Sequence, residues 1–217
     1  MLYLAPMGAQ APALEPLVPF AEAFFGLPVA VLPEVDVPPS VRTRPAPRWR
    51  VRQLFVPDLL DLLRARLPRD AQALLAFTGD DLYPDASWSY VFGLASLSDR
   101  VGVFSTARHG PPFVAAADAG GRGRERAMKL LAHEAGHMFG LAHCVHWRCL
   151  MNGANHLREF DARPLHLCPV CLRKLRHAAG FDPARRYERL ERAFREAGLE
   201  EEAGWAGARR RSLEPGR

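Results

Sequence analysis

Short apolar runs alternate with helical patterns along the first half of the chain. Three runs rich in leucine, valine and alanine have the length of strands: Leu2–Pro6, Pro28–Val35 and Leu74–Phe77. Two further stretches repeat apolar residues every three or four positions, which predicts helices over Leu14–Gly26 and Pro57–Leu67. The first half therefore predicts strands and helices in alternation, as in a sheet covered by helices.

The next part of the chain predicts a hairpin followed by a longer helix. Tyr90–Arg108 contains two strand-like runs joined by a turn at Leu97–Arg100. A loop with three glycines, Ala116–Glu125, precedes a helix with an apolar face that runs from about Glu125 to Phe139. Because a hairpin adds an antiparallel strand, the order predicts an α/β (α+β) fold. Its mixed, mostly parallel twisted sheet has one antiparallel edge strand and is packed by helices.

The remaining segments predict loops, two helices and a tail. Pro33–Arg50 holds five prolines without a regular period, which is typical of an irregular crossover. Cys168–Gly180 and Asp182–Gly198 have helical patterns, and the second begins with a capping aspartate followed by Pro183. Residues 199–217 are expected to form a flexible tail.

Composition indicates an ordinary globular protein. The chain has 217 residues, of which 48% are hydrophobic and 24% charged, and no apolar run approaches the roughly 18 residues needed to cross a membrane. The N-terminal segment has no lysine or arginine before Arg42 and is interrupted by Glu15 and Glu22, unlike a secretory signal. We expect a cytoplasmic monomer that does not bind membranes.

The positive charge does not indicate a nucleic-acid partner. The formal net charge is +5, from 27 arginines and two lysines that are spread widely along the chain. The densest run, Arg185–Glu196, mixes arginines with glutamates, which is typical of a solvated helix face. We expect no nucleic-acid binding, because no basic stripe is visible.

Three histidines and one glutamate have metal-site spacing in the segment "HEAGHMFGLAHC". In a helix, His133 and His137 emerge on one face and can chelate one metal. Gly140 can end that helix in a left-handed conformation, so that the chain turns back and His143 reaches the same metal. Three histidines leave one position open for water, as a catalytic zinc requires. Glu134 can reach this water as a general base without ligating the metal.

The cysteines indicate a second metal site. All four lie in a short region: Cys144, Cys149, Cys168 and Cys171. Two close pairs in a cytosolic protein favour metal binding over disulfides, and gaps of four and two residues match a structural zinc site with four thiolates. Such a site has no open position, so it would fix the loop that follows the histidine helix.

The pattern H-E-x-x-H-x-x-G-x-x-H-C-x4-C-x-M followed by C-x-x-C resembles the archaemetzincin family, which are zinc metallopeptidases of the metzincin clan. Thr78–Gly110, upstream of this pattern, is also similar to that family, so the resemblance covers about Leu74–Cys171. It implies a metzincin-like fold, two zinc ions per chain and a turn at Met151 beneath the catalytic zinc.

The resemblance also implies roles for individual residues. The catalytic zinc would be held by His133, His137 and His143, with Glu134 as the general base, and the structural zinc by Cys144, Cys149, Cys168 and Cys171. A peptide or protein substrate would lie along a sheet edge, for which Phe92–Leu97 is the candidate. Some metzincins stabilise the oxyanion with a tyrosine after the methionine. Here the only tyrosine beyond Met151 is Tyr187, so that group is not identified.

Two other functions are compatible with these residues. A non-catalytic zinc protein, serving as a binding module, would keep every ligand but has no use for Glu134, so the glutamate favours an enzyme. A zinc hydrolase that cleaves a non-peptide amide would need the same residues as a peptidase. The choice between aminopeptidase and endopeptidase is also open.

The elements and the motif together predict a single compact metallopeptidase domain over residues 1–217. Within it, residues 1–143 would form the sheet and the active-site helix, and residues 144–198 the zinc-stapled C-terminal loop and helices.

Overall fold

The structure is a computed structural model and describes residues 1–46, 51–108 and 122–213. Two compact units divide the chain. Unit 1 draws on Met1–Glu15 and Val29–Val114, and unit 2 draws on Pro16–Pro28 and Ala115–Arg217. The strands lie in unit 1, and unit 2 is built from helices and loops. The expectation of one domain over the whole chain stays a prediction.

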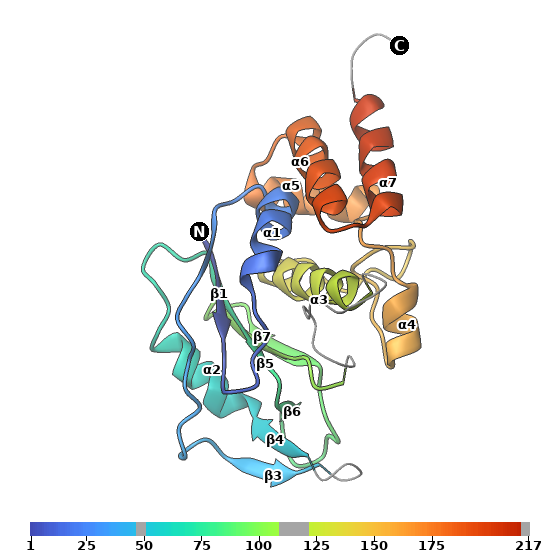
Figure 1. Ribbon diagram of the computed structural model, residues 1–217. Coiled ribbons are helices and arrows are strands. Elements are labelled where there is room, and N and C mark those ends of the chain that lie inside the picture. Colours follow the sequence, from blue (N-terminus) through green and yellow to red (C-terminus); the bar gives the residue numbers. More distant parts are fainter. Residues whose placement is uncertain (47–50, 109–121, 214–217) are drawn as a thin grey trace. The chain divides into compact units, whose positions relative to one another are not determined.

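The main sheet of unit 1 has five strands in the order β2-β1-β5-β8-β7 (Figure 1). β1, β5 and β8 are parallel to one another, and β7 pairs with β8 in the antiparallel direction at the edge. β5 and β8 are buried along their whole length, as strands in the middle of a parallel sheet usually are. The predicted mixed sheet with one antiparallel edge strand is confirmed. The five strands are β1 Leu2–Pro6, β2 Val29–Val31, β5 Ala73–Thr78, β7 Gly93–Ser96 and β8 Val101–Ser105.

Helix α2, Val56–Arg64, covers part of unit 1 with the apolar face that its sequence predicts. Four apolar side chains spaced at helical intervals are buried, and the helix packs against β4, β7 and β8. The predicted helix is confirmed, although it ends three residues before Leu67. The buried side chains are Val56, Leu59, Leu60 and Leu63.

A second, three-stranded sheet was not predicted. It consists of β3 Thr43–Pro45, β4 Arg52–Phe55 and β6 Asp81–Tyr83, with β4 in the middle. The expectation of irregular structure over Pro33–Arg50 is therefore wrong at β3. Strands of three or four residues carry too few positions to show the alternation by which a strand is recognised.

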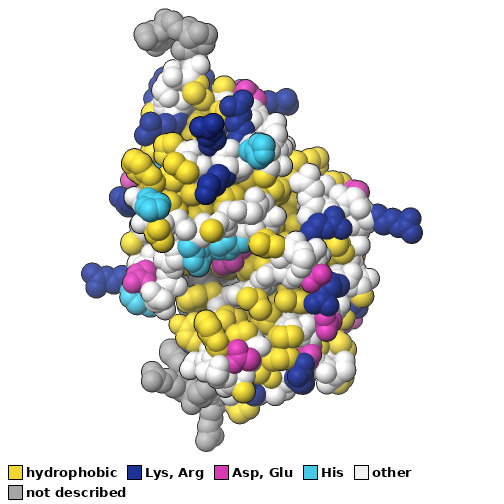
Figure 2. All heavy atoms as spheres, turned by 180° about the vertical axis from the view of Figure 1, so that it is seen from behind, with side chains coloured by type: hydrophobic (Ala, Val, Ile, Leu, Met, Phe, Trp, Pro, Cys, Tyr) yellow, Lys and Arg dark blue, Asp and Glu magenta, His cyan; other side chains and the backbone are white. Residues whose placement is uncertain are grey.

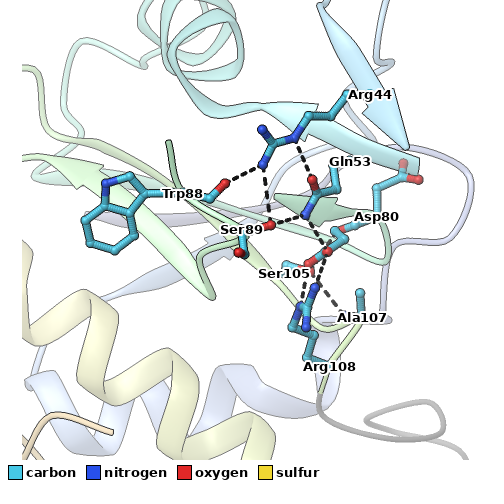
Figure 3. A network of polar contacts seen from close by, with 9 residues as sticks. Arg44, Gln53, Asp80, Trp88, Ser89, Ser105, Ala107 and Arg108 are labelled. Carbon is cyan, nitrogen blue, oxygen red and sulfur yellow. Dashed lines mark hydrogen bonds and ion pairs between the residues drawn. The ribbon is translucent and has the colours of Figure 1, made fainter. Parts of the chain in front are cut away.

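Polar side chains hold this small sheet to a neighbouring loop (Figure 3). The buried Gln53 of β4 donates from Nε2 to Asp81 Oδ2 at 2.8 Å and to the Ser89 carbonyl at 2.8 Å. Arg108 donates twice to the Asp81 carboxylate, at 2.9 and 2.7 Å, and Arg44 donates to Gln53 Oε1 at 2.8 Å. Apart from Arg44 and Gln53, these partners are far apart in sequence, so the sheet depends on contacts that no local pattern reveals.

Unit 2 is helical, and aromatic side chains join its helices. Phe20 of α1 packs on Phe194 of α6 with ring centroids 5.8 Å apart, and Phe25 stacks on Phe139 at 5.2 Å. Asp182 caps α6, as predicted, by accepting from the Arg185 N–H at 2.8 Å. After a short 3-10 turn at Glu15–Leu17, the helices are α1 Val18–Phe25, α3 Arg122–Met138, α4 Leu157–Ala162, α5 Pro169–Ala179, α6 Pro183–Glu196 and α7 Glu200–Arg211.

The prediction of a flexible tail from residue 199 is wrong, because α7 occupies Glu200–Arg211. Glutamates fill its first turn and arginines its last turn, which complements the helix dipole. Arg210 donates to Glu191 of α6 at 3.3 Å, and a Cβ on Gly207 would lie 2.9 Å from Glu191 Oε1. The small residues of α7 thus allow close packing on α6, and this packing stabilises a helix whose own apolar pattern is weak.

The start of α3 also differs from the prediction. The helix begins at Arg122, so the end of the expected loop Ala116–Glu125 is helical, while the rest of that loop lies outside the described residues. Within residues 1–46, 51–108 and 122–213, no helix is both long and apolar enough to cross a membrane. The cytoplasmic location and the monomeric state stay predictions.

Candidate functional site

Two of the three histidines project from one face of helix α3. Their Nε2 atoms lie 3.2 Å apart. His133 Nδ1 lies 2.9 Å from the Leu150 carbonyl oxygen, and His137 donates from Nδ1 to the Leu141 carbonyl at 2.6 Å. Because a carbonyl oxygen can only accept, the His137 ring carries its proton on Nδ1 and keeps the Nε2 lone pair for a metal. His133 Nδ1 is within reach of both the Leu150 carbonyl and Arg163 Nη1, 2.8 Å away.

A turn at Gly140 brings in the third histidine. Gly140 has a φ of 79°, the left-handed conformation expected of a glycine at the end of a helix. The Leu141 N–H then donates back to the Gly136 carbonyl at 3.2 Å, which closes the turn. His143 follows with its Nε2 3.3 Å from that of His133. The structure thus brings together the three imidazoles that the sequence singled out.

The spacing of these nitrogens fits zinc. Ligands about 2.0–2.1 Å from a tetrahedral zinc lie about 3.3–3.4 Å apart, close to the separations of 3.2 and 3.3 Å measured here. His133 is buried, whereas His143 is exposed, so this group is open to solvent on one side. Burial, followed by the nearby charge of Arg163, lowers the pKa of His133 well below its usual value, which favours the neutral ring that binds metal.

Glu134 lies on α3 beside the first histidine, but its carboxylate is not among the side-chain atoms that could hold a metal together with the three histidines. Burial raises the pKa of its carboxyl group to about 7, and the positive charge of Arg163 opposes this rise. A carboxyl group with a pKa near neutrality can both accept and release a proton at physiological pH.

Arg163 is a buried residue at this site that the sequence did not indicate. Its Nη1 donates to the Asn152 carbonyl at 2.9 Å and lies 2.8 Å from His133 Nδ1. Its guanidinium also lies over the Phe160 ring, 4.3 Å from the centroid. Arg163 therefore connects the histidine helix with the turn around Met151.

Met151 packs directly beneath the histidine helix. Its side chain is fully buried, and a Cβ on Gly136 would lie 2.8 Å from its sulfur. Gly136 lies between His133 and His137, so its missing side chain leaves room for the methionine. This contact agrees with the turn methionine that the family resemblance implies.

The four cysteines form a second group, largely buried. All are free thiols, and their sulfur atoms lie within 4.8 Å of one another. The sulfurs of Cys144 and Cys168 are 3.9 Å apart, close to the roughly 3.8 Å expected for two thiolates at about 2.3 Å from a tetrahedral zinc. The residues present therefore fit zinc at this group as well.

Backbone N–H groups point at these sulfurs. Cys149 Sγ accepts from the N–H of Cys168 at 3.2 Å and from that of Met151 at 3.4 Å. Cys168 Sγ accepts from the Cys171 N–H at 3.4 Å, at the N-terminus of α5. Such donors stabilise thiolates. Burial raises the pKa of Cys149 to about 11 and raises that of Cys171 as well, so a bound cation would be needed to keep both ionised.

Asn152 braces the loop between the two groups, and sequence reasoning did not identify it. Its Nδ2 donates to the carbonyls of Cys144 and Trp147 at 2.6 and 2.8 Å, and its Oδ1 accepts from the Cys149 N–H at 2.8 Å. The Cys144 N–H donates to the Met151 carbonyl at 2.8 Å. His143 and Cys144, which are neighbours in sequence, thus belong to different groups held by one loop.

Comparison with known proteins leads to the same family that the sequence motifs resemble. The model of "Peptidase family M54" matches residues 71–177, which contain both groups. Archaemetzincin-2 of Macaca fascicularis is 40% identical over 195 residues, which cover 78% of this chain and 54% of that protein. The chain belongs to the archaemetzincin family. It spans about half the length of the curated relatives that it matches.

Solved archaemetzincin structures have the same fold. The protein from Archaeoglobus fulgidus is 28% identical, with a TM-score of 0.62 over 80% of this chain and 98% of that one. The protein from Methanopyrus kandleri is 27% identical, with a TM-score of 0.65 over 83% and 95%. The predicted family and fold class are confirmed. The ligand roles of the histidines and cysteines, and the base role of Glu134, stay predictions at this point.

The substrate edge also stays a prediction. Phe92–Leu97 contains β7, which is one of the two edge strands of the five-stranded sheet in unit 1. An edge strand has unpaired backbone groups that an extended peptide could use.

Proposed function

We propose that this chain is a zinc-dependent metallopeptidase that hydrolyses peptide bonds in peptides or proteins. The observation that carries the proposal is the convergence of three imidazole Nε2 atoms at zinc spacing, beside a carboxyl group that lies outside this set of possible ligands. Membership of peptidase family M54 supports the same activity.

His133, His137 and His143 would hold the catalytic zinc. When bound there, zinc would act as a Lewis acid that polarises a peptide carbonyl and makes water more acidic. The hydrogen bond to the Leu141 carbonyl holds the His137 ring in the tautomer that this role requires, and the Leu150 carbonyl and Arg163 fix the position of the His133 ring. The chain itself thus supplies an orientation that the ion does not have to impose.

Glu134 would transfer the proton. As a carboxylate it accepts a proton from the attacking water, and as a carboxylic acid it delivers that proton to the amine of the departing peptide. Its pKa of about 7 suits both halves of this cycle near neutral pH. The charge of Arg163 favours the carboxylate form, in which the cycle begins.

Cys144, Cys149, Cys168 and Cys171 would hold a second, structural zinc. Three of these four side chains are buried, and four thiolates complete a tetrahedral ion without leaving room for water. We therefore expect two zinc ions per chain, only one of them at a site open to substrate.

Glu134→Gln tests the activity. In the zinc-loaded protein, this change removes the base but keeps the size of the side chain, so peptide cleavage should fall by about a hundredfold or more. The readout is cleavage of a peptide library, with zinc content measured on the same samples. Full activity in the variant would defeat the proposed base, and loss of zinc would mean that Glu134 is a ligand.

The library also separates the rival functions. A parent protein that carries zinc but cleaves no peptide would favour either a non-catalytic zinc protein or a hydrolase of other amides. Amide substrates without a peptide bond would then distinguish these two.

Metal analysis tests the second zinc. The parent should bind two zinc ions per chain, and the double variant Cys168→Ser with Cys171→Ser should bind one. One ion in both proteins would remove the four-cysteine site from the proposal.

A further inference from the structure

Unit 2 contains a pocket of about 500 Å³ that the peptidase mechanism does not use. The loop around Trp147 forms one side of it, and side chains of α5, α6 and α7 form the others. Its volume is within the range of ligand sites in proteins. Because α7 supplies part of the wall, the pocket depends on the segment whose helix the sequence did not predict.

Four exposed arginines line this pocket, and its lining includes no aspartate or glutamate. Among the residues that the structure describes, none of the four forms an ion pair, although other arginines of unit 2 do. Arg126, for example, lies 2.6 Å from Asp161, and Arg189 lies 3.4 Å from Glu22. In Figure 2, dark blue side chains lie among yellow ones in the upper part of the view. The arginines of the pocket are Arg148, Arg173, Arg176 and Arg209.

The wall between these charges is apolar and aromatic. His166 stacks on Trp205 with ring centroids 3.8 Å apart and an angle of 15°, and Tyr187 meets the same indole edge-on at 5.8 Å. Leu172 of α5 also lines the pocket, and Trp147 is 58% exposed. The pocket therefore offers an apolar surface to a ligand while its rim offers unpaired guanidinium groups.

We propose that this pocket binds an acidic peptide segment of another protein. Glutamates or aspartates of the segment would pair with the arginines, and an apolar side chain between them would contact Trp147 and Leu172. Guanidinium groups suit this role, since they form two-pronged hydrogen bonds with carboxylates. Such binding needs no cleavage, so it can be tested independently of the peptidase activity.

The arrangement favours a peptide over a nucleic acid. Single-stranded nucleic acids bind along a charged groove with aromatic faces open for base stacking. Here His166 already covers one face of Trp205, and the Arg209 guanidinium also lies over that ring, 5.4 Å from its centroid. The four arginines come from the Trp147 loop, α5 and α7 and line one pocket.

A different explanation is that the arginines balance the negative charge of a zinc with four thiolates. Cys168 belongs to the pocket lining, so this explanation concerns the same residues. Its distinguishing consequence is that loss of the arginines would lower zinc content, whereas a ligand site would leave zinc content unchanged.

Fluorescence anisotropy of a labelled, glutamate-rich peptide with one leucine and one phenylalanine tests the proposal on the full, zinc-loaded chain. Arg173→Glu with Arg176→Glu should weaken binding about tenfold or more, because two attractive charge pairs become repulsive. The matched control is Lys174→Glu with Arg185→Glu, which changes the net charge equally at exposed positions outside the pocket. Arg173→Gln with Arg176→Gln provides a milder variant if the charge reversal impairs folding.

Binding that falls in the pocket variant and persists in the control, with zinc content unchanged in both, would support the proposal. Equal weakening in both variants would mean that the overall charge of +5 attracts the peptide, and would overturn it. A loss of zinc in the pocket variant, no binding by the parent, or tighter binding of a labelled oligonucleotide than of the peptide would each overturn it as well.

Discussion

The two groups of unit 2 that could bind metal share one loop but differ in exposure and in side-chain chemistry. The histidine group contains neutral rings and is exposed at His143, whereas the cysteine group is buried at three of its four positions. Neutral ligands leave the charge of a zinc ion available to polarise a substrate, whereas four thiolates more than cancel that charge. With the proposed zinc ions bound, one segment would supply both a reactive centre and a closed site that holds the segment in place.

The cysteine group matters because the histidine group is only partly held by helix α3. His133 and His137 are fixed by α3, but His143 lies on a loop whose path depends on Gly140 and Asn152. Fixing Cys144, directly after His143, would limit how far the third histidine can move. Four changes can break or sharpen this comparison, and they are given in order of decreasing effect.

Cys149→Ser should have the largest effect. A structural zinc with thiolate ligands can contribute on the order of 10 kcal/mol to local folding, and Cys149 is completely buried. We expect this variant to lose solubility or to melt far below the parent in a thermal scan. His143→Ala, the control at the open group, should melt much closer to the parent. The opposite ranking would mean that the structural and catalytic roles are reversed.

Glu134→Gln should change how the stability of the metal-free protein depends on pH. The pKa of Glu134 in the folded state, about 7, lies above its ordinary value of 4.5, so the folded protein holds this proton more tightly. The stabilisation that the parent gains from this bound proton is complete below about pH 4.5 and is lost as the pH rises through about 7. At about 1.4 kcal/mol per pKa unit, the variant should gain up to about 3 kcal/mol relative to the parent over this range.

Urea unfolding of both metal-free proteins at several pH values measures this difference. The pKa values of His133 and His137 are lowered, which makes both proteins less stable as the pH falls below about 6.5, but this effect cancels in the comparison. A difference that stays constant with pH would contradict a raised pKa at Glu134.

Asn152→Ala should destabilise the shared loop. Asn152 makes three hydrogen bonds of about 1 kcal/mol each, and water can replace them in part. We therefore expect the free energy of unfolding to fall by about 2 kcal/mol. The zinc affinity of the cysteine group should fall with it, because two of the bonded residues are Cys144 and Cys149. Asn152→Asp keeps the acceptor and serves as the control, with an intermediate loss expected in chemical unfolding.

Gly136→Ala should have the smallest effect, about 1 kcal/mol of destabilisation, and it affects the histidine group alone. The new methyl group would lie too close to the Met151 sulfur, which outweighs the better helix propensity of alanine. Adding Met151→Ala removes the clash, so the two changes should cost less together than the sum of their separate costs. Strict additivity would show that the contact carries no strain.

Much of the candidate site could be predicted because its geometry is local. The helical repeat alone places His133 and His137 on one face, and the left-handed preference of glycine allows the turn at Gly140. The cysteine spacings are equally short. The strands of the main sheet could also be predicted, since a buried parallel strand such as β5 must be apolar throughout.

Only the tertiary structure decided the features that depend on distant partners. Arg163 approaches His133 across thirty residues of sequence, and β4 pairs with β6 across an intervening helix and strand. Helix α7 is stabilised by its contacts with α6, and the arginine-lined pocket exists because three helices and a loop meet around it. A sequence specifies the spacing and intrinsic preference of each segment, but burial and long-range hydrogen bonds arise only when segments meet, so they leave no local pattern to read.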